Sequence, residues 1–159
     1  MKRENKNDKS KEKEKGDGND DKVATVTDDF LILCDSYDVV NLACHETSWV
    51  IDSGASVHAT SRKNYFTSYT VGDFGNVKMG NDGLAKAIGI GDVCLSTNNG
   101  TTLILKNMKH ISDIRMNLIS TGKFDDDGFC NTFSGGQWKL TKGAMVVARG
   151  KKHSSLYLM

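Results

Sequence analysis

The stretch Trp49-Val50-Ile51-Asp52-Ser53-Gly54-Ala55-Ser56 decides the fold, because in it an apolar, strand-forming run leads directly into an acid and a turn of small residues. An Asp at the end of a strand beside a sharp turn projects from a rigid scaffold, and Gly54 allows the backbone to fold tightly against a partner loop. Ser53 adds a short hydroxyl that can hydrogen-bond to that loop. We therefore predict a reactive acid at Asp52. The alternative is an ordinary turn, because a tripeptide of this kind also occurs by chance.

Short β-rich runs separated by turn signals surround this stretch, and their spacing favours an all-β barrel or sandwich over a helical fold. Upstream, three runs have the composition of strands: FLILC over residues 30–34, DVVNLA over 38–43, and TSWVI over 47–51, which continues into Asp52. Downstream we expect four hairpins. Their turns lie at Asn81-Asp82-Gly83, Asn98-Asn99-Gly100, Ser134-Gly135-Gly136 and Lys142-Gly143.

The sequence predicts little helix. One turn is expected from Ser61 to Phe66 with Ser61 as its N-cap, and another from Ser120 to Phe124, where Gly122 weakens the helix. The predicted fold class is therefore all-β: a small closed or partly open β-barrel with one or two short helices.

The first 22 residues are charged and polar, with Met1 as the one apolar residue among them. Such a segment cannot bury enough apolar surface to offset the entropy of folding, so we predict a disordered charged tail over residues 1–22. Its lysines alternate with acids, which favours a solvated spacer over a nucleic-acid-binding arm.

The formal net charge of +1 indicates no dedicated polyanion or membrane partner, so we expect neither nucleic acid nor a membrane at the barrel. No apolar run is long enough to span a membrane or follows the basic N-terminus as a signal peptide does, so we expect a cytoplasmic protein. The four cysteines form no CxxC pair, and Cys44-His45 with His58 gives no zinc-ligand spacing. We expect no metal and no cofactor.

Five blocks of the sequence have a recognisable order and spacing: WVIDSGASVHAT (49–60), GDFGNVKMGN (72–81), GIGDVCLSTNNGTTLILKNMKHISDIRMNLIS (89–120), QWKLTKGAMVVARG (137–150) and SSLYLM (154–159). Together they resemble the polyprotein of plant Copia-type retrotransposons. The resemblance extends over about residues 28–159. The first block is similar to the catalytic loop of that family's protease. The resemblance thus implies a barrel of the retropepsin-like type, with Asp52 as the catalytic aspartate and Ser53 and Gly54 as its structural companions.

Three further features follow the pattern of the resemblance. Retropepsins have a second signature of two apolar residues followed by Gly, which falls here on Asn117-Leu118-Ile119-Ser120, with Ser120 in place of the glycine. The hairpin around Asn81 to Gly83 lies where the family places its mobile flap; the alternative is an ordinary hairpin at a barrel edge. His58 also follows the family's pattern, and the sequence gives it no mechanism.

The chemistry implied by the resemblance requires two neighbouring carboxylates, one charged to activate water and one protonated to polarise the peptide carbonyl. Since the chain has a single Asp-Ser-Gly, we expect a homodimer with one Asp52 from each subunit, acting on polyprotein peptides. Serine, cysteine and metalloproteases are not indicated, because the sequence has no nucleophile elbow and no HExxH. The alternative to an enzyme is a catalytically silent polyprotein remnant that serves as a β-barrel interaction module.

The resemblance also divides the chain into three parts. The charged tail covers residues 1–22, the retropepsin-like β-barrel domain covers residues 23–135, and a terminal β-hairpin over residues 136–159 leads toward a gag-pre-integrase region.

Overall fold

The computed structural model describes residues 29–31 and 47–159, and for residues 29–31 it describes the backbone alone. The charged tail over residues 1–22, the expected strand over 38–43 and the pair Cys44-His45 therefore lie outside the described residues. The predicted all-β class is confirmed, since the described part consists mainly of strands with one α-helix and one 3₁₀ helix. The helices are η1 (Lys63–Tyr65) and α2 (Thr121–Asp126). The strands are β1 (Asp29–Leu31), β2 (Trp49–Asp52), β3 (Ala59–Thr60), β4 (Thr70–Val71), β5 (Asn76–Met79), β6 (Leu84–Lys86), β7 (Gly89–Ser96), β8 (Thr102–His110), β9 (Asn117–Ser120), β10 (Cys130–Ser134), β11 (Gln137–Lys142), β12 (Met145–His153) and β13 (Leu156–Leu158).

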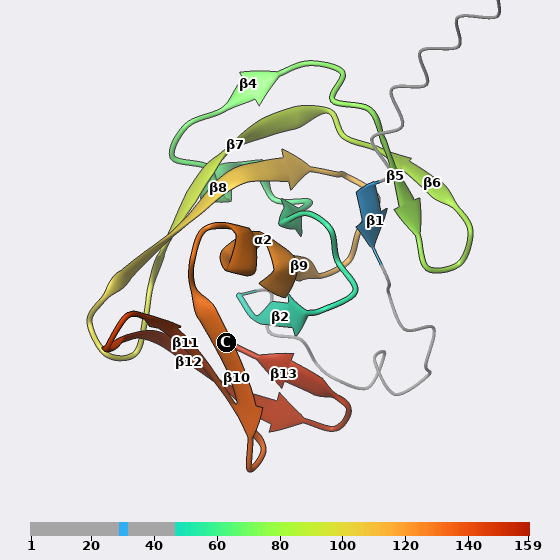
Figure 1. Ribbon diagram of the computed structural model, residues 1–159. Helices are drawn as coiled ribbons and strands as arrows, with labels where there is room; N and C mark the ends of the chain where they lie inside the picture. The colour runs from blue at the N-terminus through green and yellow to red at the C-terminus, as the bar shows by residue number, and fades with distance from the viewer. Residues whose placement is uncertain (1–28, 32–46) are drawn as a thin grey trace, which may run out of the picture.

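The strands form two sheets. The large sheet has the order β10-β11-β12-β13-β2-β9-β3-β8-β7-β4, and the small sheet has the order β1-β5-β6. The edge strands β10 and β4 do not pair with each other, so the barrel is partly open, as one of the two predicted forms. In Figure 1, β2, β9 and α2 lie in the centre of the molecule, between the long strands β7 and β8 on one side and β10 to β13 on the other.

Strands β2 and β9 are buried on both faces. Trp49 and Ile51 pack into one core cluster, whereas Val50 between them packs into a second cluster on the other face. Leu118 and Ile119 of β9 are divided between the two clusters in the same way. A strand covered on both faces needs a continuous apolar run rather than an alternating one, and the sequence has such a run before Asp52. Asp52 therefore extends from a strand that is held from both sides.

All four predicted hairpins are present. The predicted turns join β5 to β6, β7 to β8, β10 to β11, and β11 to β12, each as an antiparallel pair. The two residues between β10 and β11 are Gly135 and Gly136, with φ of 56° and 73°. Positive φ at both positions is what a two-residue hairpin of type I′ requires, and glycine adopts it without a steric penalty.

The helix cap predicted at Ser61 is wrong, whereas the helical turn expected from Ser120 to Phe124 is present as α2. Ser120 is the N-cap of α2, since its side chain accepts a hydrogen bond from Lys123 N. Ser61 does not cap η1: the N-cap position is Arg62, which makes no side-chain cap. The physical reason is that Thr60 Oγ1 already accepts from Arg62 N at 3.1 Å, while the Ser61 carbonyl contacts His110 Nε2 at 3.2 Å.

Strands β10 to β13, here called the C-terminal meander, continue the large sheet. Strand β13 pairs antiparallel with β2, with Tyr157 opposite Ile51 and Leu158 opposite Val50. The meander also supplies part of the first core cluster, which includes Trp138, Leu140, Val147 and Ala148. The expected division at residues 135 and 136 falls in the Gly135-Gly136 turn between β10 and β11.

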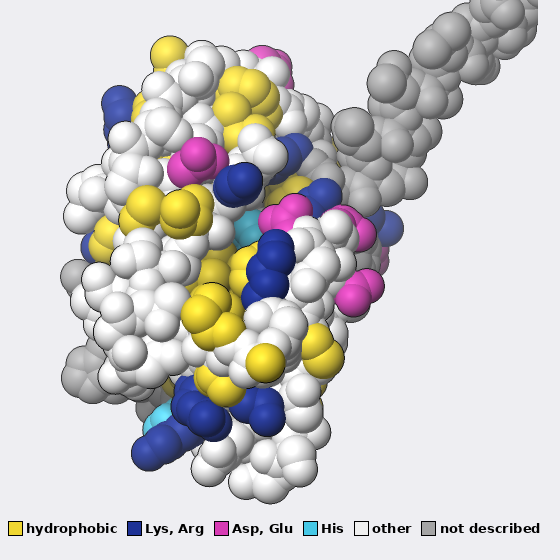
Figure 2. Space-filling view, turned by 60° about the vertical axis from the view of Figure 1, so that its left-hand side comes forward, with side chains coloured by type: hydrophobic (Ala, Val, Ile, Leu, Met, Phe, Trp, Pro, Cys, Tyr) yellow, Lys and Arg dark blue, Asp and Glu magenta, His cyan; other side chains and the backbone are white. Residues whose placement is uncertain are grey.

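Large hydrophobic side chains reach the surface from five strands. Figure 2 shows hydrophobic side chains in several groups on one face and a cluster of Lys and Arg side chains at its lower end. The exposed set consists of Val71, Leu84, Ile104, Phe133 and Met145. The cysteines of the described ranges, Cys94 and Cys130, are exposed free thiols. Within residues 29–31 and 47–159, no helix combines the length and the apolar character needed to cross a membrane.

Candidate active site

Asp52 is the last residue of β2, and its carboxylate is held by the loop that follows. The Gly54 amide donates to Asp52 Oδ1 at 2.7 Å, and the Ala55 amide also donates to this carboxylate. Asp52 is half-buried, whereas the Ser53 side chain is exposed. We call residues 52–55 the Asp52 loop. Its geometry presents one acid at the end of a rigid strand, as the sequence predicted.

The structure brings the Asp52 loop together with Asn117-Leu118-Ile119-Ser120, the segment on which the second retropepsin signature falls. These four residues form β9, which pairs parallel with β2 so that Asp52 lies opposite Ser120. Asn117 is the first residue of β9, and its side chain connects the start of the β2–β9 pair to the neighbouring segments. Its Oδ1 accepts from Thr60 Oγ1 at 2.7 Å, and its Nδ2 donates to Ser48 O at 3.0 Å. Two segments that are far apart in the sequence thus meet at the candidate acid.

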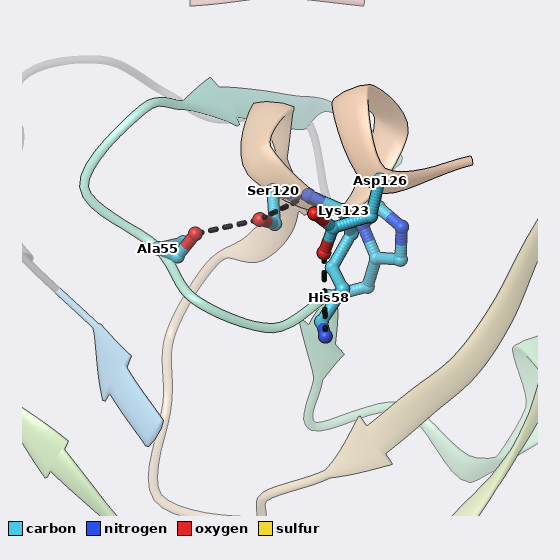
Figure 3. Close-up of polar contacts among 5 residues, drawn as sticks. All are labelled: Ala55, His58, Ser120, Lys123 and Asp126. Carbon is cyan, nitrogen blue, oxygen red and sulfur yellow. Dashed lines mark hydrogen bonds and ion pairs between the residues drawn. The ribbon is translucent and has the colours of Figure 1, made fainter. Parts of the chain in front are cut away.

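Ser120 is fully buried and connects the Asp52 loop to the start of α2. Its hydroxyl donates to the Ala55 carbonyl at 2.6 Å and accepts from Lys123 N at 3.2 Å (Figure 3). A glycine, the usual residue of the signature, has no hydroxyl to make either contact. The departure at Ser120 therefore adds a direct bond between the loop and the helix.

His58 lies behind the Asp52 loop, six residues after Asp52, and is buried. Its Nδ1 accepts from the backbone N–H of Ser120 at 3.0 Å, as Figure 3 shows. Its ring lies 5.1 Å from the ring of Phe124, centroid to centroid. Sequence reasoning gave His58 no role. The sequence signal is the coincidence of a histidine in the first block with a serine in place of the glycine of the second signature.

Burial favours the neutral forms of both ionisable groups here. Desolvation raises the pKa of the Asp52 carboxyl above its ordinary value, although the hydrogen bonds from the Gly54 and Ala55 amides act against this rise by stabilising the carboxylate. Desolvation, together with the smaller effect of the positive charge of Lys123, lowers the pKa of His58 to about 4. His58 is therefore neutral near pH 7 and can accept a hydrogen bond at Nδ1.

Other acids of the described segments have different surroundings. Asp73 is exposed and pairs with Lys86 at 2.9 Å, and its hydrogen bond to that lysine holds its pKa below the ordinary value. The carboxylate of Asp92 accepts from Asn107 N at 3.2 Å within the β7–β8 hairpin. Asp126 lies 3.9 Å from Lys123 on α2. Each of these acids serves a local contact, and none follows a strand buried on both faces.

The flap hairpin and His110 lie away from the Asp52 loop in the sheet order. The hairpin around Asn81 to Gly83 belongs to the small sheet rather than to the large sheet that carries Asp52. His110 lies on β8, where its Nδ1 contacts Tyr69 Oη at 2.8 Å. Within the described ranges, no group of three or more His, Cys, Asp or Glu side chains is arranged to hold a metal ion.

Comparison with known proteins gives a family match. The family described as "Pol polyprotein, beta-barrel domain" matches residues 49–129, which extend from the start of β2 to the residue before β10. The retrovirus-related Pol polyprotein from transposon TNT 1-94 of Nicotiana tabacum is 42% identical over 153 residues, which is 94% of this chain. The chain spans 12% of the length of that relative. No solved structure matches the chain.

Proposed function

The chain belongs to the Pol polyprotein β-barrel domain family, and from that premise we propose that it is an aspartic endopeptidase of the retropepsin-like type that cleaves its own polyprotein as a homodimer. The observation that carries the proposal is the half-buried Asp52, which follows a strand buried on both faces and lies opposite Ser120 in a parallel strand pair. Asp52 and Ser120 both lie in blocks of the sequence that resemble the retrotransposon polyprotein.

The proposed chemistry uses Asp52 from each of two subunits. Across a twofold axis the two carboxyl groups would lie about 3 Å apart, where like charges cannot both ionise and the pair shares one proton. The charged member accepts a proton from the attacking water, and the protonated member donates to the carbonyl oxygen of the scissile peptide bond. Burial already raises the pKa of Asp52 within one subunit, which is the direction that a shared proton needs.

Two further roles follow from this arrangement. The exposed Ser53 hydroxyl is assigned to a hydrogen bond with the partner loop across the twofold axis, and Gly54 allows the close approach of the two loops. The hairpin of β5 and β6 is assigned to a flap over the bound peptide. Its turn at Asn81 to Gly83 belongs to a separate small sheet, and Leu84 beside that turn is 69% exposed, which suits an apolar contact with substrate.

The test of catalysis is cleavage of peptides that cover the polyprotein, measured at about pH 5 where an aspartic pair holds one proton. We expect inhibition by a pepstatin-type statine and loss of activity in Asp52→Asn, with kcat lower by at least about 10³-fold. Asp113→Asn makes the same chemical change at an exposed site and should leave cleavage intact. Cleavage that persists in Asp52→Asn would rule out Asp52 as the catalyst.

The test of the dimer is sedimentation velocity at micromolar concentration, with the statine present and absent. We expect a concentration-dependent dimer that the inhibitor stabilises, because the inhibitor contacts both subunits. A strict monomer under both conditions would contradict the proposal for this chain by itself.

A second candidate function is a catalytically silent β-barrel that serves as an interaction module. The description of the matching family favours it, since that description names a barrel and no activity. The two candidates predict different results for Asp52→Asn: the interaction module keeps its binding partner in this variant, whereas the protease loses its activity.

A further inference from the structure

We propose that His58 is a positioning residue for Asp52, which it holds in place through a chain of hydrogen bonds that passes through Ser120 and Ala55. We call this chain the His58 relay. The inference rests on the proposed function for its catalytic meaning, but each of its bonds is a feature of the folded chain.

The first link connects His58 to β9. The N–H of Ser120 donates to His58 Nδ1 at 3.0 Å, and both residues are buried. Ser120 is the last residue of β9 and the N-cap of α2, and at this junction its amide donates to a side chain. A buried amide at this junction needs an acceptor, and the imidazole supplies one from the segment next to the Asp52 loop.

The second and third links connect Ser120 to Asp52. The Ser120 hydroxyl donates to the Ala55 carbonyl at 2.6 Å, and the Ala55 amide donates to the Asp52 carboxylate. Ala55 is thus held at its carbonyl by Ser120 while its amide holds the acid. A shift of Ser120 moves Ala55, and with it one of the amides that stabilise the charged form of Asp52.

The surroundings of His58 keep the ring neutral, which the relay requires. The charged group that acts on it from α2 is Lys123, 3.9 Å from Asp126, and the ring of Phe124 covers one side. A protonated Nδ1 would direct an N–H at the Ser120 N–H and break the first link. Neutral imidazole with its proton on Nε2 is the form that accepts at Nδ1.

The relay gives a common reason for two features that the sequence left separate. His58 is present in the first block without a mechanism, and Ser120 replaces the glycine of the second signature. A glycine would keep the backbone bond to His58 but would lose the bond to Ala55, so the relay needs both residues. A histidine that only fills the core would need neither the Nδ1 acceptor nor the hydroxyl.

The first experiment observes the relay in the unmodified chain by NMR. We expect an unprotonated Nδ1 on His58 at pH 7 and a nitrogen–nitrogen coupling across the hydrogen bond from the Ser120 amide. A protonated Nδ1, or no coupling to Ser120 in a well-resolved spectrum, would overturn the proposal.

The second experiment compares His58→Phe, which keeps a buried ring but has no acceptor, with His58→Asn, whose Oδ1 can replace Nδ1. The readout is the pKa of Asp52 from the carbon shift of its carboxyl group. We expect a further rise in His58→Phe, because the Ala55 amide moves away from the carboxylate, and a value near that of the unmodified chain in His58→Asn. For activity we expect kcat per folded enzyme to fall about tenfold in His58→Phe with KM within about twofold, and to recover in His58→Asn.

His110→Phe is the matched control, since His110 is also buried and hydrogen-bonded but contacts Tyr69 and Ser61 instead of the relay. It should lower stability without a change in the pKa of Asp52. If His58→Phe behaves in the same way, His58 has a structural role only and the proposal fails. If the unmodified chain cleaves no peptide, the proposed function fails, while the pKa of Asp52 still decides the relay.

Discussion

Asp52 and His58 lie six residues apart, and burial moves the pKa of each in the direction that favours its neutral form. The pKa of the acid is raised and that of the base is lowered, because a low-dielectric environment disfavours both charged forms. The two groups therefore change the stability with pH in opposite directions. Asp52 lowers the free energy of unfolding at neutral pH, whereas His58 lowers it when the pH falls.

The first prediction concerns pH and His58. Its pKa is about 4 in the folded chain and near 6.5 in the unfolded chain, so between these values the unfolded state binds a proton that the folded state does not. The free energy of unfolding should therefore decrease as the pH falls from about 6.5 to about 4, by up to about 3 kcal/mol from this group. Urea unfolding at a series of pH values measures this decrease.

The variant for this measurement is His58→Asn, which keeps an acceptor but does not titrate. It should lack the His58 contribution, and so lose less stability than the unmodified chain between pH 6.5 and pH 4. Equal losses in the two proteins would show that His58 titrates normally in the folded state.

At the scale of elements, two glycines in regular structure have opposite surroundings. Gly122 lies in α2, where an added Cβ would meet only Ser120 Oγ at 3.7 Å, an ordinary contact. Gly91 lies on β7, where an added Cβ would lie 1.9 Å from the backbone oxygen of Ser68. The Ser68 segment is held against β7 at this point, since the Thr67 amide donates to Asp92 O at 2.8 Å. Glycine is thus a local weakness in the helix and a packing requirement in the strand.

The second prediction is that alanine acts in opposite directions at these positions. Gly122→Ala should raise the free energy of unfolding by about 0.5–1 kcal/mol, because alanine loses less backbone entropy in a helix. Gly91→Ala should lower it by about 1–3 kcal/mol or more, because backbone has to move apart. The two urea midpoints decide this, and a shift in the same direction for both variants would contradict it.

At the scale of the whole molecule, the C-terminal meander and the segment that matches the family share one core. Trp138 and Leu140 are fully buried in the cluster that also contains Trp49 and Ile51. The meander also covers the edge of β2, where Trp49 N donates to Met159 O at 3.0 Å and Met159 N to Trp49 O at 2.9 Å. The family match ends at residue 129, but the packing does not.

The third prediction follows from this shared core. A fragment of residues 49–129 should lack cooperative unfolding, because it loses the partners of Trp49 and Ile51 and leaves the edge of β2 unpaired. Burial of large apolar side chains such as Trp138 and Leu140 contributes about 1.5–3 kcal/mol each, against a total stability of about 5–15 kcal/mol. The fragment can be compared with the full chain by the chemical-shift dispersion of its amide protons and by its binding of a dye that detects exposed apolar surface. A fragment that unfolds cooperatively would show that the matched segment is an independent domain.

The sequence by itself determined the features that depend on neighbouring residues. These are the all-β character, the four hairpin turns, the helical turn that begins at Ser120, and the position of Asp52 at the end of an apolar strand. Each depends on residues only a few positions apart, where backbone preferences and side-chain capping act directly. The cap expected at Ser61 failed because contacts from Thr60 and His110 determined the conformation there.

The tertiary structure alone decided which distant segments meet. It placed β2 between β9 and β13, opened the barrel, and set His58 against the Ser120 amide across 62 residues of sequence. No local pattern specifies these partners, because the pairing of distant strands depends on loop closure and on the packing of both faces of a sheet together. The sequence therefore supplied Asp52 as a candidate, and the fold supplied the contacts that hold it.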